Sequence, residues 1–82
     1  MVEVVYTGKF EKEVKKLDNS VKERVLPQIE KIIKNPEVGK PLKHDLKGER
    51  TVYVKPFRII YSFFDNTISF LRCEHRKEVY KK

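Results

Sequence analysis

The residues best suited to chemistry are cations and aromatic side chains gathered in the second half of this 82-residue chain. They are Lys47, Arg50, Tyr53, Lys55, Arg58, Tyr61, Arg72, His75, Arg76 and Tyr80. Cations contact phosphates and aromatic rings stack on unpaired bases, so the mixture suits RNA. A small basic domain can carry the same mixture on its solvated surface, and a strand tyrosine more often packs in a core.

Arg58 stands out because of its position in an otherwise apolar strand. Strand alternation places Phe57 and Tyr61 on one face and puts Arg58 on the other face with Ile60 and Phe64. A guanidinium among apolar neighbours is costly unless a carboxylate or an anion pairs with it. Arg58 is therefore either a member of a structural ion pair or an anion-binding group, and the residues alone leave both alternatives open.

Several motifs with familiar chemistry are missing from the sequence. It has no GxxxxGK[ST], no GxGxxG and no HExxH, and its single cysteine, Cys73, leaves no Cys/His spacing for zinc. The twelve Asp and Glu residues mostly alternate with lysines, as solvated ion-pair partners do on helix faces. We therefore expect neither a metal nor another cofactor.

The charge of the chain predicts a polyanionic partner. The formal net charge is +7 with a pI near 9.6. Residues 1–42 carry nine Lys and Arg against seven Asp and Glu, whereas residues 43–82 carry ten against five. The excess of +5 in the second half coincides with the cations and aromatics named above, which favours binding of nucleic acid there.

The hydrophobic pattern predicts an α+β fold in a single domain, residues 1–82. The expected elements are a strand over Val2–Tyr6, a helix over Phe10–Leu17, a second helix that starts at Ser20 and ends by Asn35-Pro36, and strands over Arg50–Lys55, Phe57–Phe64 and Thr67–Cys73. The helices should form a hairpin, and the last three strands an antiparallel meander whose sheet carries the helices on one face. Residues 74–82 are expected to form a short tail or helix.

Local signals refine these elements. Ser20 and Glu23 have the spacing of a capping box at the start of the second helix. Pro27 inside that helix costs about 3 kcal/mol and predicts a kink. Residues 37–48 are expected to form a basic, mobile loop, and Asp65-Asn66 marks a hairpin turn. No signal peptide or long apolar run is found, so we expect a cytoplasmic protein without a membrane segment.

Three segments resemble the RelE branch of the RelE/ParE toxin superfamily. They are Lys43-His44-Asp45-Leu46-Lys47-Gly48, Val52-Tyr53-Val54-Lys55-Pro56-Phe57-Arg58-Ile59-Ile60-Tyr61 and His75-Arg76-Lys77-Glu78-Val79-Tyr80. The likeness spans nearly the whole chain. It implies a toxin that cleaves messenger RNA on the ribosome, with Arg58 holding the scissile phosphate, Arg76 near the leaving group and Tyr80 as the base. The lysines that the family places before the turn are poorly matched here.

The resemblance also implies partners and a form of the reaction. An RNA 2′-OH is the available nucleophile without a metal, and it leaves a cyclic phosphate. His75 is an alternative acid or base. Contacts to RNA are expected from Lys43, Lys47, Arg50, Tyr53 and Lys55.

The expected partners are the ribosome, messenger RNA and a RelB-like antitoxin whose helical segments wrap the toxin, with a 2:2 heterotetramer as one assembly consistent with it. Two other functions stay open from the residues: a ParE-like toxin that acts on gyrase without nuclease activity, and a basic RNA- or ribosome-binding domain without catalysis. The HRxxVY ending argues against the gyrase alternative.

Overall fold

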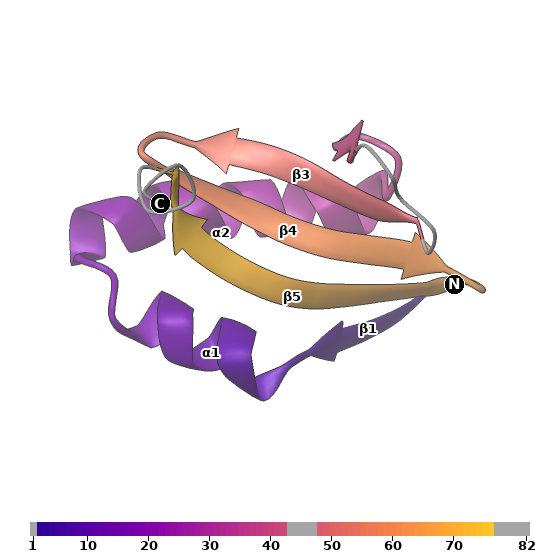
Figure 1. The fold of residues 1–82 in the computed structure, drawn as a ribbon, viewed down its shortest axis with the longest axis horizontal. Coiled ribbons are helices and arrows are strands. Elements are labelled where there is room, and N and C mark those ends of the chain that lie inside the picture. The colour runs from indigo at the N-terminus through magenta and orange to yellow at the C-terminus, as the bar shows by residue number, and fades with distance from the viewer. Residues whose placement is uncertain (1, 43–47, 77–82) are drawn as a thin grey trace.

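The computed structural model describes residues 2–42 and 48–76 and confirms the predicted α+β class (Figure 1). Its elements are β1 (Glu3–Tyr6), α1 (Gly8–Lys15), α2 (Asn19–Lys34), β2 (Lys40–Pro41), β3 (Glu49–Val54), β4 (Phe57–Phe64) and β5 (Thr67–His75). They form one five-stranded sheet in the order β1-β5-β4-β3-β2. Neither described helix is long and apolar enough to span a membrane.

The sheet is larger than the predicted meander. β3, β4 and β5 pair antiparallel as expected, and β1 adds to β5 in parallel, with Glu3 opposite Thr67. The two-residue strand β2 was missed within the predicted loop, where it pairs antiparallel with β3. A parallel partner for β1 is possible because α1 and α2 carry the chain across the sheet before the meander begins (Figure 1).

The start of α2 differs from the sequence prediction. Asp18 is the N-cap and Ser20 lies inside the first turn, so the predicted capping box of Ser20 with Glu23 is wrong. The helix runs through Pro27 without a break. Thr7 caps α1 by accepting the amide of Phe10, and its hydroxyl also donates to the carbonyl of Phe70, which ties the helix start to β5.

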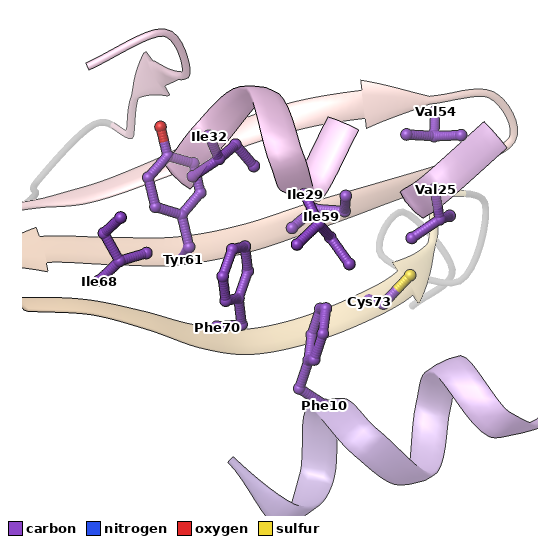
Figure 2. Close-up of a cluster of buried hydrophobic side chains, with 10 residues drawn as sticks. All are labelled: Phe10, Val25, Ile29, Ile32, Val54, Ile59, Tyr61, Ile68, Phe70 and Cys73. Carbon is purple, nitrogen blue, oxygen red and sulfur yellow. The ribbon is translucent and has the colours of Figure 1, made fainter. Parts of the chain in front are cut away.

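Both helices place their apolar faces on the same face of the sheet, and Figure 2 shows the side chains that meet there. This core contains Phe10, Val25, Ile29, Ile32, Val54, Ile59, Tyr61, Ile68, Phe70 and Cys73. Tyr61 is fully buried, and its hydroxyl donates to the carbonyl of Pro36 at 2.7 Å and accepts the amide of Gly39 at 2.9 Å. Burial raises the pKa of Tyr61, which keeps the hydroxyl protonated as a donor.

A β-bulge at Leu71 changes which β5 side chains face the helices. Tyr61 pairs with Phe70 and Ile60 pairs with Arg72, so Leu71 is the extra residue on β5. Before the bulge Ile68 and Phe70 face the core, and after it Cys73 does. Arg72 and Glu74 are thereby turned to the opposite face of the sheet, which the helices do not cover.

Candidate functional site

The sheet face opposite the helices carries a cluster of charged and aromatic side chains, called here the outer-face cluster. Its members are Tyr53, Arg58, Arg72, Glu74 and Arg76. The strand register aligns three of them in one row, because Tyr53 on β3 pairs with Arg58 on β4, and Arg58 pairs with Glu74 on β5. Directly paired residues point to the same face, so these side chains are neighbours.

Arg58 and Glu74 form the central contact of the outer-face cluster. The Glu74 Oε2 accepts from Arg58 Nε at 3.1 Å and from Nη2 at 2.9 Å. The two side chains are only 16% and 19% exposed. Charge-assisted bonds between side chains this shielded from water are stronger than those of a surface pair. The structure therefore shows Arg58 as an ion-pair member, which is one of the two alternatives left by the sequence.

Arg58 nevertheless keeps donors available for a second acceptor. A guanidinium has five N–H groups, and Glu74 uses only those of the Nε and Nη2 edge. Within the described part of the chain, Nη1 of Arg58 makes no hydrogen bond. An anion can therefore bind the remaining edge without breaking the contact to Glu74.

Two further arginines surround this contact. Arg72 Nε lies 3.9 Å from Glu74 Oε1. The guanidinium of Arg76 lies over the Tyr53 ring, 4.8 Å from the centroid, and its backbone amide donates to the carbonyl of Pro56. Two guanidinium groups, those of Arg58 and Arg72, thus contact the carboxylate of Glu74. With Arg76, the outer-face cluster holds three positive charges and one negative charge, a balance that favours phosphate.

Two of the residues predicted for the site lie on the helix-covered face instead. His75 pairs with Phe57, and the two rings meet edge to face at 5.0 Å. Arg50 pairs with Tyr61, and its Nη1 donates to the carbonyl of Gly39 at 2.8 Å. The structure therefore separates both side chains from Arg58.

The other residues predicted to bind or cleave RNA either lie at one end of the sheet or fall outside the described residues. Tyr53 is 44% exposed and belongs to the outer-face cluster. Lys55 is exposed in the turn between β3 and β4, where its carbonyl accepts from Arg24. Lys43, Lys47 and Tyr80 lie outside the described residues.

Glu74 is the site residue that the sequence prediction missed, because it was assigned to the tail. β5 continues to His75, which makes Glu74 a strand residue. The sequence did contain a signal. In a regular strand, Arg72 and Glu74 would point to the same face as Ile68 and Phe70, and charged side chains are rarely buried in a core with such residues. A one-residue bulge resolves that conflict.

Cys73 is not a nucleophile in this fold. It is 2% exposed, and its amide donates to Glu13 Oε1 at 2.7 Å. Burial, and then the charges of Glu13 and Glu74, raise the pKa of the Cys73 thiol to about 11. A thiol with this pKa is almost entirely protonated at neutral pH, and the thiolate is the reactive form.

Taken together, the fold and the outer-face cluster define a small α+β protein with three arginines and one glutamate on the sheet face opposite the helices. The family described as "ParE toxin of type II toxin-antitoxin system, parDE" matches residues 4–80. Because this match covers nearly the whole chain, the protein belongs to that family of toxins. Comparison with curated protein sequences finds no match.

Solved structures with the same fold are toxins of the RelE kind. The toxin–antitoxin complex RelBE2 from Mycobacterium tuberculosis is 26% identical, with a TM-score of 0.75, over 92% of this chain and 98% of that chain. The RelB–RelE complex from Methanococcus jannaschii is 23% identical over 93% and 94%, with a TM-score of 0.77. The isolated RelE toxin of E. coli is 16% identical over 98% and 92%, with a TM-score of 0.79. These structures confirm the RelE/ParE resemblance seen in the sequence.

Proposed function

We propose that this toxin cleaves messenger RNA on the ribosome, by attack of the RNA's own 2′-OH and without a metal ion. The observation that carries the proposal is the outer-face cluster, where Arg58 is fixed by Glu74 and still offers free N–H donors. Preorganised guanidinium groups stabilise the charge that develops on a phosphorane. The reaction leaves a 2′,3′-cyclic phosphate and a 5′-hydroxyl. Because the proposed target is the translating ribosome, we propose that the toxin acts in the cytoplasm.

Three residues of the outer-face cluster contact RNA in this proposal. Arg58 binds the scissile phosphate through its free edge, and Arg76 stabilises charge near the leaving 5′-oxygen. Tyr53 offers a ring on which a base can stack, since almost half of it is exposed and it is the cross-strand neighbour of Arg58. Lys43, Lys47 and Lys55 contact the phosphates of flanking nucleotides, and Tyr80 takes part in proton transfer.

The structure gives less support to two residues expected at the site from the sequence. The hydrogen bonds of Arg50 to the carbonyls of Glu37 and Gly39 hold the segment before β2. His75 packs on Phe57 on the helix-covered face. We therefore assign neither residue a direct contact with the scissile phosphate.

Cleavage on programmed ribosomes tests the proposal. Purified toxin is added to ribosomes stalled on a defined messenger, and cleavage is followed by primer extension. Arg58→Gln and Arg76→Gln are expected to slow cleavage by about 100-fold or more, because each removes a charge that acts in the transition state. Lys31→Gln, which removes one positive charge from the exposed side of α2, is the matched control and should cleave like the wild type.

A second set of assays distinguishes RNA cleavage from the gyrase-directed alternative. The messenger carries a 2′-deoxy substitution at the cut site, which removes the nucleophile and should abolish cleavage. Intact messenger at concentrations of toxin that stop translation would refute a nuclease. Inhibition of DNA gyrase supercoiling by the same preparation would instead show the ParE-like activity.

An antitoxin partner is the second part of the proposal, and a groove beside α1 fits one. The structures from M. tuberculosis, M. jannaschii and E. coli include complexes with RelB-type antitoxins. The groove has an apolar floor and a rim with three lysines and one glutamate, and is lined by Tyr6, Gly8, Phe10, Val14, Leu26, Ile29, Glu11, Lys12, Lys15 and Lys22. Leu26 is 57% exposed, which is unusual for a large apolar side chain beside a groove. We infer that an acidic amphipathic helix of the antitoxin lies there.

Co-expression with the neighbouring open reading frame tests this partner. Leu26→Asp should weaken co-purification of the antitoxin, because it places a carboxylate against the apolar face of an acidic helix. Val38→Asp is the matched control, since Val38 is a similarly exposed apolar residue outside the groove. Equal loss of binding in both variants would refute docking in the groove, and the mass of the complex tests a 2:2 assembly.

A further inference from the structure

We propose that Glu74 is the general base, the group that takes the proton from the attacking 2′-OH. This inference rests on the proposed RNA cleavage and names a catalytic residue for it. Glu74 is the carboxylate that contacts Arg58, and its side chain, on the sheet face opposite the helices, is only 19% exposed. No other carboxylate among the described residues forms an ion pair with Arg58.

The shared guanidinium places Glu74 beside the reacting atoms. Glu74 occupies the Nε and Nη2 edge of Arg58 and leaves Nη1 free. Both edges belong to one rigid planar group, so a phosphate on the free edge lies next to the carboxylate. The 2′-oxygen that attacks this phosphate belongs to the ribose on its 3′-linked side. In the proposed complex the ribose is oriented with this oxygen between phosphorus and the Glu74 carboxylate, within reach of the proton acceptor.

The step conserves atoms and charge. The 2′-O–H proton passes to a Glu74 oxygen as the bond between the 2′-oxygen and phosphorus forms. The bond from phosphorus to the 5′-oxygen breaks, and that oxygen leaves with a proton that is drawn ultimately from water. Glu74 then returns its proton to solvent, so neither an oxidant nor a metal is required.

The neighbours of Glu74 allow a carboxylate to work next to a phosphate. Arg58 and Arg72 each contact it, and Arg76 adds a third positive charge to the cluster. These guanidinium groups offset the repulsion between carboxylate and phosphate, which would otherwise expel the RNA.

Other candidate bases are less well placed. His75 and Cys73 face the helices, on the far side of the sheet from Arg58. Glu49 lies on the outer face but pairs with Ser62, four residues along β4 from Arg58. Glu3 lies on β1 opposite Thr67, at the other end of β5 from Glu74.

Glu74→Gln is the decisive variant. The glutamine oxygen still accepts hydrogen bonds from Arg58, but the amide cannot take up the proton. On programmed ribosomes we expect single-turnover cleavage to fall by about 100-fold or more. Binding of a messenger with a 2′-O-methyl group at the cut site should be unchanged or tighter. Glu3→Gln makes the same chemical change on the same sheet face, and should cleave at the wild-type rate.

Two measurements keep the result interpretable. Thermal unfolding of Glu74→Gln by circular dichroism shows that the variant is folded under the assay conditions. Glu74→Ala leaves space for formate, and added formate should restore part of the lost rate, because it returns a carboxylate to that space.

The outcomes separate this inference from the function on which it rests. Wild-type toxin that leaves every messenger intact would overturn the proposed cleavage and the role of Glu74 together. Cleavage by the wild type and by Glu74→Gln at equal rates would overturn the role of Glu74 alone. Faster cleavage by Glu74→Gln would also overturn it, because Glu74 would then only compete with RNA for Arg58.

Discussion

The contact between Arg58 and Glu74 gives a prediction about stability that does not depend on activity. Replacing Arg58 by Met removes two hydrogen bonds from a Glu74 side chain that is 19% exposed. Among the residues that the structure describes, Arg72 at 3.9 Å is then the ion-pair partner that Glu74 keeps. Replacing Glu74 by Gln keeps an acceptor for Arg58 but removes the carboxylate that both Arg58 and Arg72 contact. Both changes should destabilise the fold.

The exposure of the two side chains sets the magnitude. Exposed ion pairs contribute about 0 to 1 kcal/mol, whereas removal of one partner from a fully buried pair costs about 3 to 5 kcal/mol. With both side chains largely shielded and Arg72 nearby, we expect Arg58→Met to cost about 2 to 3 kcal/mol and Glu74→Gln about 1 to 2 kcal/mol. The double variant should cost less than the sum, with a coupling energy of about 1 to 2 kcal/mol.

Urea unfolding of the four proteins measures this coupling. For a domain of this size the m value is about 1 kcal/mol per molar urea, so Arg58→Met should lower the midpoint by about 2 M. The coupling should persist in 0.5 M NaCl, because salt screens exposed pairs much more than shielded ones. A coupling below about 0.5 kcal/mol, or one that vanishes in salt, would refute the argument that burial strengthens this contact.

Three further predictions concern the core and the bulge. Burial raises the pKa of the Cys73 thiol from 9.0 to about 11. At pH 8 the thiol should therefore react with iodoacetamide about 100-fold more slowly in the native protein than in urea, because the thiolate is the reactive form. Equal rates would contradict the burial of Cys73. Tyr61→Phe should lower the free energy of unfolding, measured in urea, by about 1 to 3 kcal/mol, because the amide of Gly39 and the carbonyl of Pro36 lose their buried partner. An unchanged free energy of unfolding would show that water replaces the hydroxyl. Deletion of Leu71 should keep cooperative unfolding, because regular pairing of the shortened strand still places Glu74 opposite Arg58, and Leu71→Ala should keep the fold as well. Loss of cooperative unfolding in the deletion variant would refute the role assigned to the bulge.

Much of the fold follows from local patterns. The strand Phe57–Phe64 has the predicted bounds, since its turn residues mark both ends. Asp65 and Asn66 both have positive φ, as the two-residue hairpin turn requires. The N-cap of α2 was predicted two residues late, at Ser20 instead of Asp18. Both residue types are good caps, and the local sequence does not choose between them.

The candidate site followed from the sequence only in part. Alternation of residue types already showed that Arg58 needs a partner, since a guanidinium in an apolar strand is costly without one. Strand pairing identified that partner as Glu74, and the same pairing placed Arg50 with Tyr61 on the helix-covered face. Contacts of this kind join residues far apart in the chain, so no local pattern contains them.

The sequence by itself determined the α+β class, the basic second half and the presence of Arg58 in an apolar strand, because these depend on residue type and period. The tertiary structure decided which charged residue meets Arg58. A two-residue turn at Asp65-Asn66 with regular pairing would place Arg58 opposite Cys73, and the extra residue Leu71 shifts the pairing to Glu74. Alternation makes a one-residue shift reverse every later side chain. The bulge therefore puts Glu74 on the open face and His75 on the helix side.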